Sequence, residues 1–246
     1  MRETCPRCRR PVAHCLCALV PPMKCRTKLV VLMHPHELKR VKANTGRLAA
    51  LSFEDAEIVV GVEFDGNARF RELLADPAFV PMLLYPGEGS RNLSEGALAP
   101  EELGGRRLLV ILLDATWPLA RKMLRLSPSL QALPRLMFTP RERSRWVIKR
   151  QPHELCLSTL EAVHELMAAL DSAGLDRYER PGQLLAAFEA MQALQVARAA
   201  DPDSPGYRRN PERARSVREA FESGRSSEIR QKSRGLFYKD PARKEP

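Results

Sequence analysis

The sequence predicts an α/β protein whose mostly parallel sheet is flanked by helices. Short apolar runs of strand length alternate along the chain with longer stretches that have helical spacing. The most apolar run, Leu108–Leu113, contains no polar residue, which is typical of a strand buried on both faces. Strands that alternate with helices favour parallel βαβ connections.

The elements are expected in the following order. Strands are predicted at Lys28–Met33, Glu57–Val62, Val80–Leu84, Leu108–Leu113 and Leu136–Phe138. Helices are predicted at Arg40–Leu51, Arg69–Leu74, from Pro118 onward, from the Ser158–Glu161 capping box to about Ala173, and at Gly182–Ala200. Pro118 suits the first position of a helix, and the Ser-x-x-Glu spacing is a helix start signal.

Composition changes suggest three regions. Residues 1–22 form a small cysteine-rich unit that ends at Pro21-Pro22, residues 23–200 form the α/β body, and residues 201–246 form a basic tail. The tail is poor in apolar residues, which favours flexibility, although Glu212–Ser223 has the character of a short helix. The sequence shows no apolar leader and no run near the roughly 20 residues needed to span a bilayer, so we expect a cytoplasmic protein with no membrane partner.

Positive charge gathers in two places. The net charge is +10, and residues 1–50 hold eleven Lys and Arg side chains against two acids. A second cluster comprises Arg141, Arg143, Arg145, Lys149 and Arg150. Clustered cations favour a polyanion such as nucleic acid, because each neutralised phosphate releases counterions. A solvated basic face without a partner would have the same composition.

Four of the six cysteines are closely spaced. Cys5, Cys8, Cys15 and Cys17 form a Cys-x2-Cys-x6-Cys-x-Cys pattern, while Cys25 and Cys156 have no partner motif. Two close cysteine pairs supply the four thiolates of a tetrahedral zinc site. We therefore predict a structural Zn²⁺ knuckle, with free or redox-active thiols, or His14 in place of one sulfur, as alternatives.

Polar or glycine-rich loops follow three of the predicted strands. They are His34–Glu37, Tyr85–Ser90 and Asp114–Trp117, and in a parallel sheet they would emerge at the same carboxyl edge, where ligands gather. Asp114 directly follows the most apolar strand, so poor solvation can raise its pKa and make it a general base. It could instead only bond the next helix, with Trp117 in the core, and Gly87 and Gly89 could form a plain turn. No Gly-x-Gly-x-x-Gly or Walker loop is present.

These segments together resemble the DTW-domain family, the tRNA-uridine aminocarboxypropyltransferases. The resemblance rests on the cysteine pattern and on motifs that run in order through residues 5–190: His34-Pro35-x-Glu37-x-x-Arg40, Asn44-Thr45-Gly46-Arg47-Leu48, Leu84-Tyr85-Pro86, Asp114-x-Thr116-Trp117, Leu133-Pro134-Arg135 and Leu157-Ser158-Thr159-Leu160-Glu161-Ala162. Ala115 departs from the glycine that is frequent in the family, and the tail lies outside the resemblance.

The resemblance implies a SPOUT-like, knotted α/β fold that uses S-adenosylmethionine as donor and tRNA as acceptor. The 3-amino-3-carboxypropyl group would pass to N3 of a uridine, with methylthioadenosine released. The implied catalytic residues are Asp114, Thr116 and Trp117. The implied donor-binding residues are Leu84, Tyr85, Pro86, Gly87, Leu113, Asp114, Leu157, Ser158 and Thr159. RNA would contact Arg40, Arg47, Arg141, Arg143, Arg145, Lys149 and Arg150, although Arg40 or Arg47 could instead hold the donor carboxylate.

Two other functions remain open on the sequence. A SPOUT-type RNA methyltransferase would use the same donor and transfer a different carbon. A non-catalytic, zinc-bearing RNA-binding module would not bind the donor.

Overall fold

The computed structural model describes residues 3–40, 44–148, 155–201 and 211–223. At its centre is a sheet in the order β2-β1-β5-β3-β6-β4, in which every paired neighbour is parallel. Its strands are β1 (Lys28–Met33), β2 (Ala56–Val60), β3 (Phe79–Leu84), β4 (Arg91–Asn92), β5 (Arg107–Asp114) and β6 (Arg135–Met137). The predicted α/β class and parallel sheet are confirmed, whereas the SPOUT-like knot stays a prediction.

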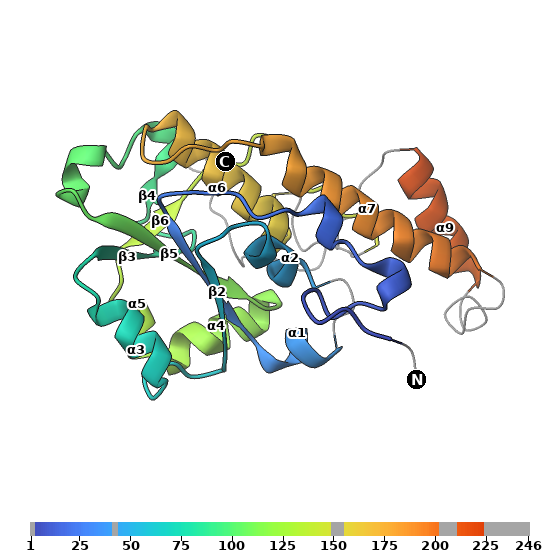
Figure 1. Ribbon diagram of the computed structural model, residues 1–246, viewed down its shortest axis with the longest axis horizontal. Coiled ribbons are helices and arrows are strands. Elements are labelled where there is room, and N and C mark those ends of the chain that lie inside the picture. The colour runs from blue at the N-terminus through green and yellow to red at the C-terminus, as the bar shows by residue number, and fades with distance from the viewer. Residues whose placement is uncertain (1–2, 41–43, 149–154, 202–210, 224–246) are drawn as a thin grey trace, which may run out of the picture.

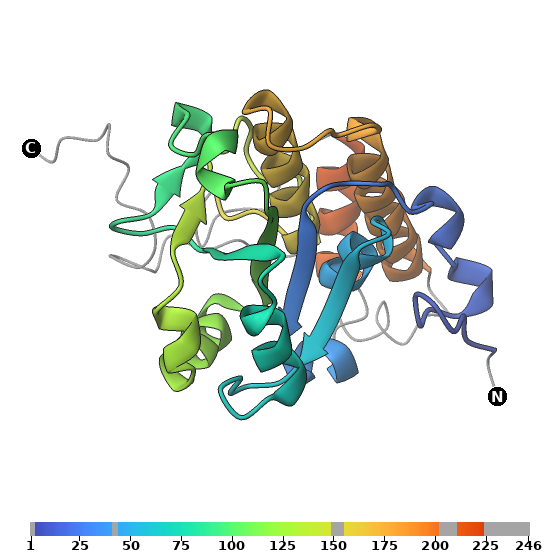
Figure 2. The same cartoon turned by 60° about the vertical axis from the view of Figure 1, so that its left-hand side comes forward.

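Helices cover both faces of the sheet (Figures 1 and 2). One face carries α2 (Thr45–Leu51), α6 (Thr159–Ser172) and α7 (Pro181–Ala200), and the other carries α3 (Ala68–Ala75), α4 (Trp117–Leu126) and α5 (Pro128–Gln131). The short α1 (Pro35–Arg40) follows β1 directly. In the described part of the chain, no helix is both long and apolar enough to cross a membrane.

The two faces of β1 separate two hydrophobic cores. Val31 and Met33 pack in the cluster that contains α2, α6 and α7, while Val30 and Leu32 pack in the cluster that contains α3, α4 and α5. Because successive side chains of a strand point to opposite faces, a strand buried on both sides must be apolar throughout. This is why β1 and β5 have continuous apolar sequences.

The prediction of a single helix at Arg40–Leu51 is wrong. The structure has α1 ending at Arg40 and α2 beginning at Thr45, with Asn44 between them. The Asn44 side chain accepts a hydrogen bond from the backbone N–H of Arg47 at 2.8 Å and donates one to the carbonyl oxygen of Glu37 at 3.0 Å. Asn44 therefore caps the start of α2 and bonds back to α1, a local interaction that competes with a continuous helix.

The cysteine-rich unit packs on the body through its apolar residues. Leu16 and Val20 are buried in the same core cluster as α6 and α7. The unit contains two 3₁₀ turns, η1 (Val12–His14) and η2 (Cys17–Leu19), and η2 contacts α7 (Figure 1). In the tail, α9 (Pro211–Glu222) forms close to the predicted bounds and packs on α7.

Candidate active site and metal centre

Asp114 is the last residue of β5 and lies in the middle of the sheet's carboxyl edge. Its neighbour across the ladder is Met33, the last residue of β1. Its side chain is 4% exposed, and its Oδ1 accepts a hydrogen bond of 2.6 Å from the Thr159 hydroxyl. Thr159 is the first residue of α6, so α6 begins against the carboxylate.

A second helix approaches the same carboxylate from the other side. Gly46, in the first turn of α2, lies very close to the Asp114 carboxyl group. A Cβ atom at this position would overlap the carboxyl group and would lie only 2.7 Å from its Oδ1 atom. Only glycine can bring the α2 backbone this near. Asp114 is thus enclosed between the first turns of α2 and α6, where the N-terminal ends of helix dipoles favour negative charge.

Two aromatic side chains lie at the same edge of the sheet. Tyr85 follows β3 and Trp117 begins α4, and their rings meet edge to face with centroids 6.2 Å apart. The Arg135 guanidinium carbon lies 5.6 Å from the centre of the Tyr85 ring. Burial raises the pKa of Tyr85, and the charges of Arg121 and Arg135 only partly offset this effect. Tyr85 is therefore a neutral, half-buried ring beside cations.

Arg47 connects this edge to the cysteine-rich unit. Burial lowers the pKa of Arg47 and the charge of Arg9 lowers it further, while Cys8 and Asp114 oppose these effects. The Arg47 guanidinium therefore lies within electrostatic reach of both the carboxylate and the knuckle. Arg47 thus has both a like-charged neighbour, Arg9, and groups of opposite charge, Cys8 and Asp114, around it.

The four predicted metal ligands converge as expected. The sulfur atoms of Cys5, Cys8, Cys15 and Cys17 all lie within 4.8 Å of one another. The Sγ atoms of Cys5 and Cys17 are 3.8 Å apart, and so are those of Cys8 and Cys15. A tetrahedron with Zn–S bonds of about 2.3 Å has sulfur–sulfur edges of about 3.8 Å. The geometry of the cluster therefore fits Zn²⁺.

The surroundings of the Cys5 sulfur atom suit a thiolate, whereas burial raises the pKa of Cys17 to about 12 in the absence of a metal. Backbone hydrogen bonds from Cys8 and Arg7 lower the pKa of Cys5 to about 6. Arg10 is 7% exposed, and burial lowers its pKa while Cys8, Cys15 and Cys17 raise it. A buried guanidinium needs a counter-charge, and four thiolates around a divalent cation carry a net negative charge that would supply it.

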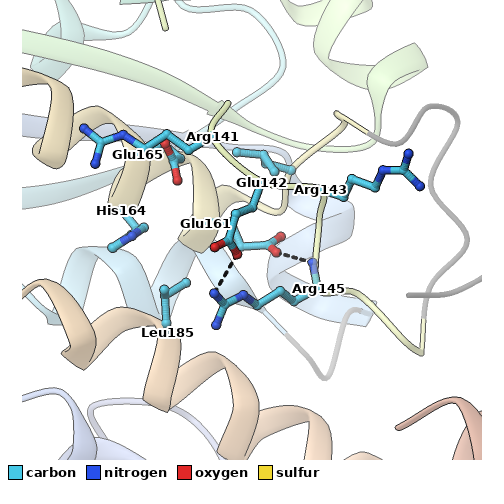
Figure 3. Close-up of a pocket in the computed structure, with 9 residues that line it drawn as sticks. Arg141, Glu142, Arg143, Arg145, Glu161, His164, Glu165 and Leu185 are labelled. Atoms are coloured by element: carbon cyan, nitrogen blue, oxygen red, sulfur yellow. Dashed lines mark hydrogen bonds and ion pairs between the residues drawn. The ribbon is translucent and has the colours of Figure 1, made fainter. Parts of the chain in front are cut away.

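The described arginines of the predicted Arg141–Arg150 cluster share their surroundings with acidic residues, so this surface is not uniformly basic. Arg141, Arg143 and Arg145 line a cavity of about 200 Å³ against α6 and α7, but Glu142, Glu161 and Glu165 line it too (Figure 3). Arg145 forms an ion pair of 2.7 Å with Glu142. Glu161 accepts hydrogen bonds from the Ser144 hydroxyl and the Arg145 backbone. Three carboxylates thus offset much of the positive charge.

The other predicted site residues lie in several places. Ser158 caps α6 through the expected capping box, whereas Thr116 is exposed at the cap of α4 and forms no side-chain capping bond. Leu84, Pro86 and Leu113 are half-buried at the ends of β3 and β5, Gly87 is exposed beside Arg135, and Leu157 faces the cavity of Figure 3. Lys149, Arg150 and the Arg40 side chain lie outside the described residues. Arg9 and Arg135 were not selected from the sequence, although Arg135 and Gly46 lie within motifs quoted above.

Comparison with known proteins identifies the family of the chain. The DTW domain model matches residues 2–196. The chain is 34% identical to tRNA-uridine aminocarboxypropyltransferase 2 of Drosophila melanogaster, over 70% of this chain and 68% of that protein. It is 30% identical to the Mus musculus protein of the same name, over 79% and 66%, and 26% identical to tRNA-uridine aminocarboxypropyltransferase A of Arabidopsis thaliana, over 70% and 74%. The matches span about two thirds to three quarters of these relatives. No solved structure matches the chain significantly. From the family match across most of its length, this chain belongs to the DTW domain family.

Proposed function

We propose that this protein transfers the 3-amino-3-carboxypropyl group of S-adenosylmethionine to N3 of a uridine in tRNA. The observation that carries the proposal is the buried Asp114 carboxylate at the carboxyl edge of a parallel sheet, where α/β proteins bind ligands. The names of the matched relatives supply the reaction class. Their shared activity, together with this carboxylate, makes an alkyl transfer a better explanation than passive RNA binding.

In this reaction, uridine N3 forms a bond to the methionine Cγ while the Cγ–sulfur bond breaks. The electron pair of the broken bond stays on sulfur, which leaves as methylthioadenosine. The N3 proton must be removed, and Asp114 is the candidate base, with Thr159 holding its Oδ1 at 2.6 Å. Because the sulfonium activates three carbon atoms, the choice of Cγ over the methyl carbon depends on positioning.

The remaining residues of the site have assigned roles in this proposal. The donor would lie over the ends of β3 and β5 and against the start of α6, from Leu84–Gly87 to Leu157–Thr159. Tyr85 and Trp117 offer an aromatic surface for a base that has left its stack, as RNA-modifying enzymes require. Arg47, close to Asp114, is suited to the donor carboxylate or an RNA phosphate.

Zinc has a structural role in the proposal. The knuckle would hold Zn²⁺ through Cys5, Cys8, Cys15 and Cys17, and a metal with four cysteine ligands has no open position for chemistry. Its effect on the reaction would come through the residues that it positions, such as Arg9.

Mass analysis of nucleosides tests the proposal. tRNA incubated with the protein and S-adenosylmethionine should yield aminocarboxypropyl-uridine, which is heavier than a methylated uridine. Asp114→Asn keeps the side-chain volume and the acceptor for Thr159, and we expect it to slow transfer by about 100-fold or more. Asp76→Asn is a matched control, because Asp76 is an exposed carboxylate that accepts a backbone hydrogen bond at the end of α3.

The pH profile then separates a base from a residue that only positions substrate. If Asp114 is the base, the deficit of Asp114→Asn should shrink as pH rises, because the uridine N3–H ionises by itself. A pH-independent deficit would assign a positioning role. Methylated nucleosides alone would show that the transferred group is wrong, and unmodified tRNA with no bound donor would favour a binding module.

A further inference from the structure

A second cavity lies between the cysteine-rich unit and α7. Its volume is about 90 Å³, and its lining comprises Arg9, Arg10, Pro11, His14, Leu194, Gln195 and Arg198. Figures 1 and 2 both show the knuckle beside the C-terminal half of α7. The lining contains three arginines and no carboxylate, in contrast to the cavity of Figure 3, which includes three glutamates.

Two of the three cations of this cavity, Arg9 and Arg198, have no counter-charge among the described residues, whereas the sulfur atoms of the knuckle act on Arg10. No salt bridge or side-chain hydrogen bond involves Arg9 or Arg198 in the part of the chain that the structure describes. Arg10 Nη2 and His14 Nδ1 are buried without a hydrogen-bond partner in the same described part. Buried polar groups normally have partners, so the unsatisfied Arg10 donor beside the unpaired cations Arg9 and Arg198 indicates a site for an anion.

The backbone of Arg9 is unusual as well. Its φ angle is +55°, and no other described residue apart from glycine has a positive φ. This left-handed conformation follows the Cys5–Cys8 turn, in which the Arg9 N–H bonds the Cys5 carbonyl oxygen at 2.9 Å. Glycine would adopt it without steric cost. A long cationic side chain at a position that favours glycine is consistent with a functional use of that side chain.

Arg9 lines this cavity and also acts electrostatically on Arg47, next to the candidate active site. The charge of Arg9 lowers the pKa of Arg47, and Arg47 in turn interacts with Asp114. Arg198 reaches the same cavity from the last turn of α7. We name Arg47, Arg9 and Arg198 the knuckle track, a series of cations that leads from Asp114 across the knuckle to α7.

We propose that Arg9 and Arg198 bind phosphodiester groups of the RNA substrate, so that the strand carrying the target uridine follows the knuckle track away from Asp114. The inference rests on the proposed function and adds to it the path of the RNA backbone. A phosphodiester is the anion that suits the track, because it repeats along a strand as the cations do and accepts hydrogen bonds from several arginines. The expected role of the Arg141–Arg145 cluster becomes smaller, because glutamates share its cavity.

Equilibrium binding of tRNA, measured by fluorescence anisotropy at several salt concentrations, tests the track. Arg198→Gln and Arg9→Asn are the variants, and asparagine is chosen because it tolerates a positive φ. Loss of one phosphate contact should weaken binding roughly five- to eightfold at 0.1 M salt and reduce the salt slope by about 1. Arg71→Gln is a matched control, because Arg71 is exposed on α3, on the opposite face of the sheet.

Each outcome is informative. Weaker binding and a smaller salt slope for both variants, with Arg71→Gln and donor binding unchanged, would support the track. If the wild type binds and modifies tRNA but both variants bind as tightly as Arg71→Gln, the track is wrong while the proposed function stands. If the wild type binds no RNA at all, both the track and the proposed function are overturned. Far-UV circular dichroism and zinc content show that each variant is folded.

Discussion

Replacing Gly46 with alanine tests the enclosure of Asp114. The added methyl group would overlap the carboxyl group of Asp114, which is held by Thr159 and is 4% exposed, so it has little room to move. Overpacking of this kind costs about 1–3 kcal/mol, whereas alanine in a helix gains at most about 1 kcal/mol over glycine. We therefore expect Gly46→Ala to lower the free energy of unfolding by about 1–2 kcal/mol, as measured by urea denaturation.

Two further variants isolate the cause. Gly182 occupies the same position in the first turn of α7 that Gly46 occupies in α2, but nothing lies within 4 Å of its Cβ position. Gly182→Ala should therefore be neutral or slightly stabilising. In an Asp114→Ala background the clash is absent, so Gly46→Ala should also become neutral or stabilising. This double-mutant cycle should give a coupling of about 2 kcal/mol. The reasoning is refuted if Gly46→Ala has the same effect in both backgrounds.

Three other predictions concern the site, the metal and the sheet. Thr159→Val removes the hydrogen-bond donor to Asp114, so it should reduce the free energy of unfolding by about 1–3 kcal/mol and slow transfer. Thr159→Ser keeps a hydroxyl and should retain most of the stability and most of the transfer rate. Equal transfer rates for the two variants would contradict this role. The purified protein should contain zinc by mass spectrometry, with less in Cys17→Ser and an unchanged amount in Cys25→Ser, because Cys25 bonds the Thr27 carbonyl oxygen away from the cluster. Burial raises the pKa of Asp55, but hydrogen bonds from Lys28 and Arg107 outweigh burial and hold the pKa below 3.8. The stability that the ionised carboxylate contributes is therefore present above that pH and is lost as the pH falls. In urea titrations, Asp55→Asn should lose less stability than the wild type between about pH 5 and pH 2.

Local sequence patterns located most of the elements. The strand at Lys28–Met33 matches its predicted bounds, and the capping box at Ser158–Glu161 starts α6 as expected. These succeed because periodicity and capping are properties of neighbouring residues. Two-residue β4 is too short to have a pattern. The break at Asn44 depends on whether its side chain bonds the backbone groups of Glu37 and Arg47 or leaves a continuous helix intact.

The cysteine spacing predicted the surroundings of the cysteines, whereas the charge pattern did not indicate which side chains would surround the cations. Four cysteines within thirteen residues can converge with little help from the rest of the chain, and they do. The cations at Arg141–Arg145, in contrast, share a cavity with Glu161 and Glu165 of α6. Residues 141–145 lie shortly before α6 in the sequence, and α6 is the next described element, but their neutralisation depends on which face of that helix they meet.

By itself, the sequence determined the α/β class, the parallel strands, the cysteine cluster and the position of Asp114 at a strand end. Each of these follows from the order of apolar and polar residues over short stretches. The tertiary structure decided that Gly46 and Thr159 enclose Asp114, and that Arg9 and Arg198 share a cavity without a carboxylate. Such contacts join residues that are tens to hundreds of positions apart, and the packing of helices across the sheet, which no local pattern encodes, brings them together.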